Sequence, residues 1–225
     1  MKPLLSESND DDALRLLGRA SVQVVHDLKN QLNGLKLYAT FLKKRLEKGE
    51  RPADELETVT KLITGLDRMA KDVSLITQFG RPLELNKKAG TDLGQIMREV
   101  AGGLKQEGES QPPVLVKGTE SLTGQFDPIL LADALKWISL GALKLNAKAP
   151  DTSLEIQLKD DETGSAKHGV IEWKVFDSSD HDPFHSFAGS NELQLSLAAR
   201  VIEAHGGSAS RENGALCVRL PLDKN

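Results

Sequence analysis

Three residues near the start of the chain have the types and the spacing needed for phosphoryl chemistry. His26 is followed directly by Asp27, and Asn30 comes four residues after the histidine. A neutral imidazole nitrogen can accept a phosphoryl group, and a neighbouring carboxylate can orient the ring or deprotonate it. An amide one helical turn further on can position a water molecule or an incoming acid. The residue types and their spacing are therefore compatible with phosphoryl chemistry at His26.

These residues lie in a segment whose apolar positions step by threes and fours from Leu14 to Leu46. The spacing predicts one long helix with a heptad seam, ending near Gly49. At about 100° per residue, His26 lies roughly opposite seam positions such as Leu28. The histidine is therefore expected on an exposed face.

A second amphipathic segment follows, with Pro52 suited to its first turn and Gly80 close to its end. Two long helices joined by a short turn predict an antiparallel hairpin. Because two helices alone bury little apolar surface, we expect two copies to form a dimeric four-helix bundle. We assign residues 1–82 to this dimerisation and phosphoacceptor domain.

The remaining residues, 83–225, alternate between helical and strand patterns. Helices packed against an antiparallel or mixed sheet predict a two-layer α/β sandwich, so the fold class of the whole chain is α + α/β. The expected helices are 93–104, 128–145 and 192–204, and the expected strands are 114–116, 154–158, 170–176 and 215–222, with a polar turn at 159–168.

Several residues on or beside the face of His26 are candidates for partner binding. Leu37 and Phe41 are large and apolar, yet they point away from the heptad seam. Either another part of the protein covers them, or they form a docking strip for a partner helix. Neighbouring lysines suit an acidic pocket, although a lysine stripe is also ordinary solvated surface. The candidate set is Lys29, Asn33, Leu37, Phe41 and Lys44.

Composition excludes several classes of protein. The formal net charge of -4 does not favour a nucleic-acid partner. Charged residues interrupt the most apolar stretch, 129–145, and the N-terminus lacks the apolar run of a secretion signal, so we expect a cytoplasmic protein without a membrane partner. Cys217 is the single cysteine, which excludes an intramolecular disulfide and a cysteine-based zinc site.

The stretch from Val25 to Leu32 resembles the H-box of the bacterial two-component sensor histidine kinases. In that family the histidine is the phosphoacceptor, the acidic residue after it assists as a base, and a nearby Asn or Thr supports dephosphorylation of the response regulator. The resemblance implies these roles for His26, Asp27 and Asn30, and it implies response-regulator receiver domains as partners. Gln31 stands where the family usually has a proline.

The resemblance continues into the second half of the chain. Residues 127–135 resemble the approach to the N-box of the family's ATP-binding domain, and residues 199–207 resemble the helix and turn after its last glycine box. Residues 216–222 look like its closing strand. The resemblance therefore implies an ATPase-type domain for residues 83–225.

Departures from the family pattern fall where nucleotide binds. Trp137 and Gly141 occupy the N-box positions usually held by asparagines, the second of which holds magnesium in the family. Asp177 matches the aspartate that reads adenine, but the lid segment after it is nearly absent. Glu192 places a carboxylate in the region of the last glycine box, where it would repel polyphosphate. We therefore expect no cofactor, with ATP and magnesium binding weak or lost.

The short loop at 177–185 is rich in acids and histidines. Asp177, Asp180, His181, Asp182 and His185 could suggest a metal site. A polar loop that remains after loss of the lid accounts for them equally well, and we expect no metal.

Four functions are compatible with these residues. The first is a histidine phosphotransferase of a phosphorelay, in which His26 accepts a phosphoryl group from one receiver aspartate and passes it to another. Its phosphoryl donor is already activated, so it needs no nucleotide. The alternatives are a divergent ATP-dependent sensor histidine kinase, a non-catalytic pseudokinase that binds a response regulator, and a response-regulator phosphatase that depends on Asn30.

Overall fold

The structure is a computed structural model, and the side chains of His26 and Lys29 are not among those it describes. Asp177 and Asp180 lie outside the described residues altogether. The described ranges are 7–48, 52–79, 82–106, 113–119, 121–147, 153–161, 167–176, 181–186 and 189–223.

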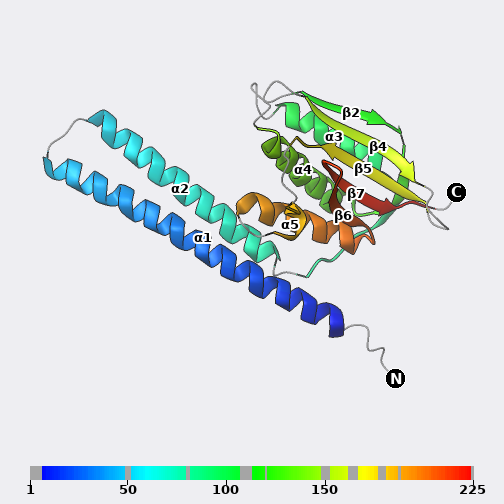
Figure 1. Ribbon diagram of the computed structural model, residues 1–225, viewed down its shortest axis with the longest axis horizontal. Coiled ribbons are helices and arrows are strands. Elements are labelled where there is room, and N and C mark those ends of the chain that lie inside the picture. The colour runs from blue at the N-terminus through cyan, green and yellow to red at the C-terminus, as the bar shows by residue number, and fades with distance from the viewer. Residues whose placement is uncertain are drawn as a thin grey trace. The chain divides into compact units, whose positions relative to one another are not determined.

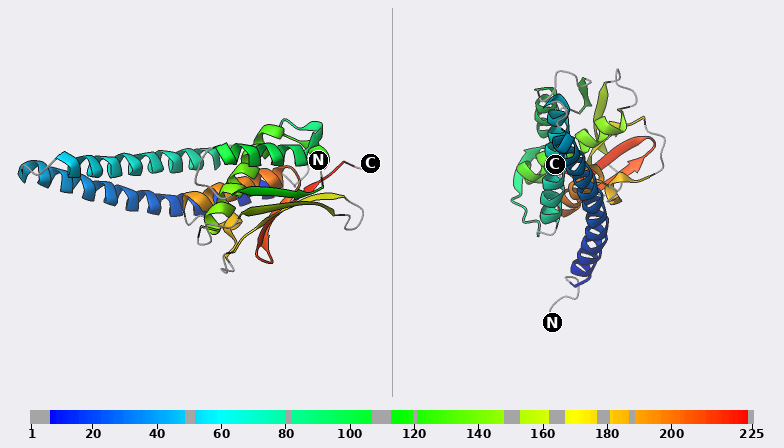
Figure 2. Two further views of the ribbon diagram at one scale, coloured as in Figure 1. Left: turned by 90° about the horizontal axis from the view of Figure 1, so that it is seen from above. Right: turned by 90° about the vertical axis from the view of Figure 1, so that its left-hand side faces the viewer.

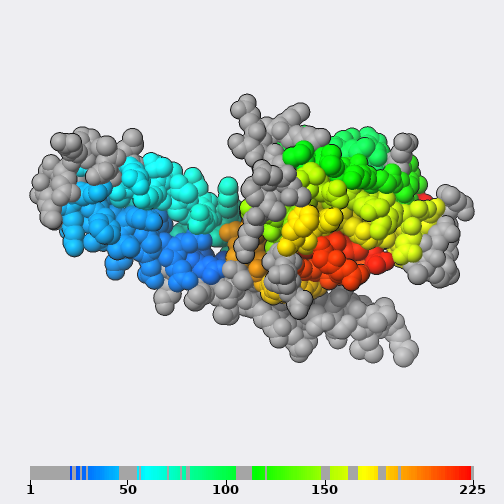
Figure 3. All heavy atoms as spheres, turned by 45° about the horizontal axis from the view of Figure 1, so that its top comes forward, coloured from blue at the N-terminus to red at the C-terminus, as the bar shows by residue number. Residues whose placement is uncertain are grey.

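The first compact unit contains two long helices, α1 (Glu7–Lys48) and α2 (Pro52–Phe79), which run side by side as a hairpin (Figure 1). Their atoms, blue and cyan in Figure 3, lie against one another along the hairpin. The helices approach closely at Gly65, where an added Cβ would lie 2.8 Å from Leu35 Cδ2. Both helices predicted from the heptad spacing are confirmed.

The second compact unit contains all the strands and the remaining helices. Its main sheet has the order β2-β4-β5-β7-β6, in which β2 and β4 are parallel and the other neighbours are antiparallel. A separate antiparallel pair joins β1 (Lys88–Asp92) to β3 (Thr123–Phe126). The main strands are β2 (Val114–Gly118), β4 (Leu154–Asp161), β5 (His168–Lys174), β6 (Ser208–Glu212) and β7 (Ala215–Pro221).

Helices cover one face of this sheet, as Figure 2 shows, and the core lies between the two layers. They are α3 (Leu93–Gln106), α4 (Pro128–Leu145) and α5 (Ser190–Ala204), with a short 3-10 helix η1 (Pro183–His185). Trp173 of β5 is fully buried, and its indole Nε1 donates a hydrogen bond to Ser139 Oγ of α4 at 2.9 Å. The mixed two-layer α/β architecture expected from the sequence is therefore present.

The local sequence explains where these elements begin. Asp127 caps α4, because its carboxylate accepts hydrogen bonds from the backbone N–H groups of Ile129 and Leu130, and Pro128 occupies the first turn. In β4, Leu154, Ile156 and Leu158 face the core, while the residues between them are half-buried or exposed. This alternation is the pattern that predicted the strand.

Three strands and one turn differ from the sequence expectation. Strands β1, β3 and β6 were not predicted, because they are short and lack an alternating apolar face. The polar turn expected at 159–168 is wrong at both ends, since β4 continues to Asp161 and β5 begins at His168. An ion pair between Lys159 and Glu172, at 2.7 Å, links the two polar strand faces there. Hydrogen bonding between β4 and β5 thus extends both strands into residues whose sequence by itself favours a turn.

Among the described helices, none combines the length and the apolar character that a membrane crossing requires.

Candidate functional site

The predicted phosphoacceptor lies within α1, where the helix supplies a regular scaffold. His26, Asp27 and Asn30 all belong to this helix. The Asp27 side chain is half-buried and the Asn30 side chain is exposed, and each takes part in an interaction. At about 100° per residue, the helix directs His26 and Asn30 to positions about 40° apart around its axis. The two residues therefore lie on the same side of the helix backbone.

The candidate docking residues lie along α1 after His26, and those whose side chains are described are exposed. Leu37 is 55% exposed and Phe41 is 54% exposed, with Asn33 and Lys44 exposed beside them. In the described structure both apolar side chains are thus exposed. The side chain of Lys29, the remaining candidate, lies outside the description.

A second group of exposed apolar residues runs along both helices. On α1, Val25 and Leu32 are seven residues apart, and both are exposed although they belong to the predicted seam. The seam residue between them, Leu28, is half-buried. On α2 the exposed apolar residues recur with heptad spacing. The group, called the apolar stripe below, comprises Val25, Leu32, Val59, Ile63, Leu66 and Val73.

One polar pair interrupts the contact between the two helices. Gln31 Nε2 of α1 donates a hydrogen bond to Asp72 Oδ2 of α2 at 2.8 Å. Asp72 is only 4% exposed. The amide oxygen of Gln31, Oε1, and the second carboxyl oxygen of Asp72, Oδ1, are buried and have no hydrogen-bond partner among the described atoms. Gln31 therefore has a specific partner at the position where the sequence departs from proline.

Sequence reasoning missed Asp72. A signal was present, since Asp72 lies between Met69 and Ile76, both at apolar seam positions of the second helix. A carboxylate at three- and four-residue spacing from seam residues faces the partner helix. Only its hydrogen bond to Gln31 shows which residue it meets.

In the second unit, the positions that correspond to the family's N-box are packed by neighbouring side chains. Gly141 of α4 is buried, and a Cβ on it would lie 2.8 Å from Leu195 Cδ2 of α5. Trp137, one turn earlier on α4, is half-buried and packs against the core. An asparagine side chain at position 141 could therefore be accommodated only if Leu195 moved.

Polar residues near the start of α5 bind one another. The Ser186 hydroxyl donates a hydrogen bond to the carboxylate of Glu192, and His181 Nε2 lies 3.7 Å from Glu192 Oε2. Lys144 at the end of α4 donates a hydrogen bond to Asn191. The carboxylate of Glu192 thus lies in the first turn of α5, at the end where a phosphate would otherwise be favoured.

A buried histidine joins the beginning of α4 to the end of α5. The backbone N–H of Asp127 donates to His205 Nε2 at 2.9 Å, and His205 Nδ1 lies 2.7 Å from the carbonyl oxygen of Val201. Burial is the largest effect on the ring and lowers the pKa of His205, so the neutral form is favoured. Burial alone would raise the pKa of Asp127, but backbone hydrogen bonds, led by that from Leu130, lower it overall.

The acid- and histidine-rich loop does not assemble a metal site among its described residues. His185 Nδ1 lies 2.7 Å from Asp182 Oδ2, and its other ring nitrogen is 4.0 Å from Glu203 Oε1. Within the described part of the chain, no group of three or more His, Cys, Asp or Glu side chains could hold a metal ion. Asp177 and Asp180 lie outside the described residues.

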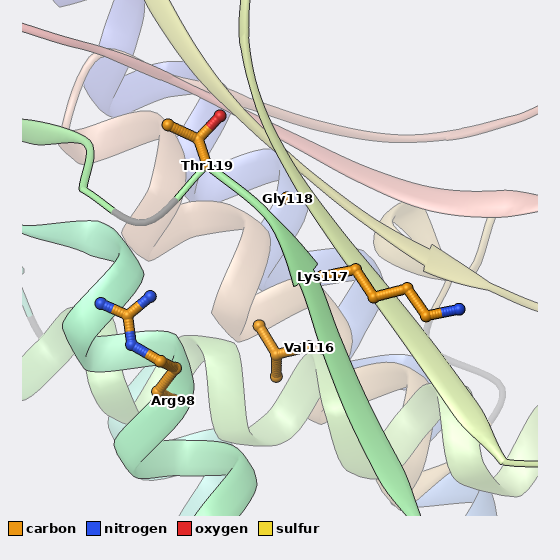
Figure 4. A pocket seen from close by; sticks show the side chains of 5 residues that line it. All are labelled: Arg98, Val116, Lys117, Gly118 and Thr119. Carbon is orange, nitrogen blue, oxygen red and sulfur yellow. The ribbon is translucent and has the colours of Figure 1, made fainter.

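A cavity of about 430 Å³ lies between α3 and strand β2 at the edge of the sheet (Figure 4). Arg98 approaches it from α3, and Val116 and Thr119 come from the β2 side, whereas Lys117 points away from Arg98 and pairs with Glu155 at 3.2 Å. None of the residues singled out from the sequence lines this cavity.

Comparison with solved structures identifies the fold. The histidine kinase ThkA, solved in complex with the response regulator TrrA, matches with a TM-score of 0.69 and 18% identity over 99% of this chain and 68% of that chain. Full-length ShkA in complex with AMPPNP matches with a TM-score of 0.57 and 15% identity over 88% of this chain, which spans 46% of the ShkA chain. The histidine kinase AdeS of Acinetobacter baumannii gives 0.52 and 15%, over 89% of this chain and 98% of that chain.

No protein-family model matches the sequence, and no curated protein matches it. At 15% to 18% identity, the likeness to the three solved structures shows the fold alone. The chain has the fold of the histidine kinases, with a helical hairpin followed by an α/β sandwich.

Proposed function

We propose that this chain is a two-component signalling protein in which His26 exchanges a phosphoryl group with the aspartate of a response-regulator receiver domain. One observation carries the proposal: the fold follows ThkA, a histidine kinase solved with a response regulator, over 99% of this chain. The pattern of His26, Asp27 and Asn30 in α1 supports it independently. The assignment of residues 1–82 and 83–225 to a phosphoacceptor domain and a kinase-derived domain belongs to the same proposal.

The proposed step transfers the phosphoryl group from a receiver aspartyl phosphate to His26. The unprotonated imidazole nitrogen of His26 attacks the phosphorus of a receiver aspartyl phosphate, so an N–P bond forms and a P–O bond breaks. The receiver aspartate leaves as a carboxylate. Asp27 accepts a hydrogen bond from the other ring nitrogen, which keeps its proton and gains positive charge during transfer. Asn30, on the same side of α1, contributes to removal of the phosphoryl group from the receiver.

The apolar stripe supports a homodimer as part of the proposal. Its six side chains are between 37% and 63% exposed, and they lie along one side of both helices. Exposed apolar residues that recur at heptad spacing are typical of a helix face that packs against a partner helix. Pairing two copies through the stripe would give the four-helix bundle and leave the strip at Leu37 and Phe41 free for the receiver.

Two sources of the phosphoryl group are compatible with this fold, and different observations support each. The comparisons support a divergent ATP-dependent histidine kinase better than a phosphotransferase, because the matched proteins are histidine kinases and ShkA was solved with AMPPNP.

The local packing supports a phosphotransferase without nucleotide. Leu195 packs against Gly141, where the kinases would place a magnesium-binding asparagine, and Glu192 adds a negative charge nearby. Losing hydrogen bonds to charged phosphate groups costs roughly 1.5–3 kcal/mol each, which is enough to remove micromolar affinity when several are lost.

Phosphoryl labelling of the full chain tests both parts of the proposal. The protein is incubated separately with radiolabelled ATP and with phosphorylated receiver domains, and the label is followed in the wild type and in His26→Gln. We expect His26-dependent label from at least one source. Label from ATP supports the kinase, and label only from receivers supports the phosphotransferase.

His26→Gln is the matched control, since it keeps a polar side chain but cannot form the N–P bond. Absence of label from both sources, with receiver binding intact, would contradict phosphoryl exchange and leave a binding role. Label that persists in His26→Gln would assign the chemistry to another residue.

A further inference from the structure

Among the described side chains, the contact between α1 and α2 contains apolar residues and also a part-buried hydrogen bond. The α1 residues on this side include Leu28, Leu35 and Leu42, which are half-buried at heptad spacing. Gln31 and Asp72, called the register pair below, lie within the same seam and bind through Gln31 Nε2 and Asp72 Oδ2.

The register pair is poorly explained as a source of stability. Asp72 is nine-tenths buried, and one oxygen of its carboxylate and the carbonyl oxygen of Gln31 have no partner among the described atoms. A buried carboxylate with incomplete hydrogen bonding is less favourable than a well-packed apolar pair. A single polar residue in a helix seam can instead specify the axial register of the helices, at a cost in stability.

We propose that the register pair fixes the axial position of α1 against α2 and thereby positions His26 for transfer; the positioning part rests on the proposed role of His26. Apolar side chains tolerate sliding because each can pack against several neighbours, whereas this hydrogen bond forms in one register only. Gln31 follows His26 by five residues in the same helix, so the two are about 7.5 Å apart along the axis and move together.

The position of the pair adds a reason for its effect on chemistry. Moving one helix past the other by one turn would shift His26 by about 5.4 Å relative to α2. Misplacement of a reacting group by about 1 Å can slow a reaction by about a hundredfold. Gln31 and Asp72 are therefore positioning residues, because they act through the placement of His26 rather than on the phosphoryl group.

The test compares three forms of the full chain with the wild type. Gln31→Leu combined with Asp72→Leu removes the polar pair and keeps the seam filled. Asp72→Asn keeps the hydrogen bond from Gln31 Nε2 and adds a donor for Gln31 Oε1. Thr58→Val is the matched control, since Thr58 is a buried polar residue of the same helix, two heptads away from Asp72.

Helix register is measured without reference to phosphoryl transfer, by distances between spin labels at Thr40→Cys and Thr64→Cys, both exposed positions. Labelled chains are mixed with excess unlabelled protein, so that distances within one hairpin dominate. The single native cysteine, Cys217, is buried. We expect a broadened or shifted distribution in the double-leucine variant, and wild-type distributions in Asp72→Asn and Thr58→Val.

Transfer and binding are then measured on the unlabelled forms. The double-leucine variant should melt at least as high as the wild type, bind receivers with unchanged affinity, and transfer the phosphoryl group at least about tenfold more slowly. Asp72→Asn, which keeps the hydrogen bond from Gln31, should transfer the phosphoryl group at the wild-type rate. If the register pair only stabilised the fold, the transfer rates of the variants would instead rise and fall with their melting temperatures.

Two results would overturn the inference. A double-leucine variant with the wild-type distance distribution would show that the pair does not set the register. A changed distribution with a transfer rate equal to that of Thr58→Val would show that register does not control His26. If the wild type itself acquires no label, the proposed function fails, and the spin-label distances alone decide the register role.

Discussion

Leu195 of α5 packs against Gly141 of α4 so closely that a Cβ on the glycine would lie 2.8 Å from Leu195 Cδ2. The leucine is buried in the core of the second unit, and the helix surface beside it carries no side chain at position 141. The α4–α5 contact therefore occupies space that an asparagine side chain at position 141 would need.

This contact predicts a graded response to side chains at position 141. Gly141→Asn should destabilise the fold by about 1–3 kcal/mol through overpacking, and Gly141→Ala should have a smaller effect. Leu195→Ala alone should cost about 2–5 kcal/mol, because it leaves a cavity. The double variant Gly141→Asn with Leu195→Ala should cost less than the sum, as measured by urea unfolding. Strict additivity would contradict the contact.

The apolar stripe predicts that dimerisation can be removed without unfolding the chain. Leu32→Glu and Leu66→Glu place charges at positions that are 55% exposed in the protomer, so they should leave the α/β unit folded but abolish association. Sedimentation equilibrium gives the mass, and circular dichroism checks the fold. A dimer that persists with both substitutions present would place the interface elsewhere.

The docking strip predicts that receiver binding can be weakened without a change in dimerisation. Leu37→Glu and Phe41→Glu should weaken receiver binding at least about tenfold, which corresponds to about 1.4 kcal/mol, and leave the mass of the assembly unchanged. Thr40→Glu, an exposed position between them, serves as the matched control for added charge. Equal weakening by all three would indicate a general electrostatic effect rather than an apolar contact.

The proposed role of Asn30 predicts that its substitution affects removal of the phosphoryl group from the receiver but not its acceptance by His26. Asn30→Ala should slow dephosphorylation of a phosphorylated receiver, measured as the half-life of the label, while His26 is still labelled. His26→Gln provides the comparison: if it leaves receiver dephosphorylation intact while Asn30→Ala abolishes it, the protein acts as a phosphatase. Unchanged half-lives in Asn30→Ala would exclude a role of this amide.

His205 predicts a loss of stability as the pH falls through weakly acidic values. Burial lowers the pKa of His205 in the folded chain, whereas the unfolded chain binds the proton at about pH 6.5. Its stabilising contribution is therefore complete above that pH and is lost as the pH falls from there toward the lower folded pKa.

Urea unfolding between pH 7.5 and 5 should show this loss in the wild type. His205→Gln can still accept the hydrogen bond from the backbone N–H of Asp127 but does not titrate, so its stability should depend less on pH in this range. A nuclear magnetic resonance titration of the ring measures the shift directly. A folded-state pKa at or above the ordinary value would contradict the prediction.

Hydrophobic spacing and capping residues predicted most of the regular elements. Asp127 and Pro128 begin α4 at the expected residue, and Leu154, Ile156 and Leu158 face the core as their alternation indicates. These features depend on neighbours a few residues apart. The short strands β1, β3 and β6 lack such a pattern, and they exist because another strand offers hydrogen bonds.

Some features of the candidate site likewise follow from the sequence, whereas others depend on tertiary structure. The spacing of His26, Asp27 and Asn30 and the presence of Trp137 and Gly141 in α4 are properties of the sequence. The partner of Gln31 is not, because Asp72 is 41 residues away and competes with every other side chain of α2 until the helices meet.

By itself, the sequence predicted a helical hairpin that carries His26 and an α/β domain after it. Tertiary structure decided which seam residues pack within the hairpin and which, like Leu32 and Leu66, stay exposed. It also decided that Leu195 fills the space beside Gly141. The physical reason is that burial and hydrogen bonding between distant segments depend on how complete helices pack, whereas helix formation depends on residues within a turn or two.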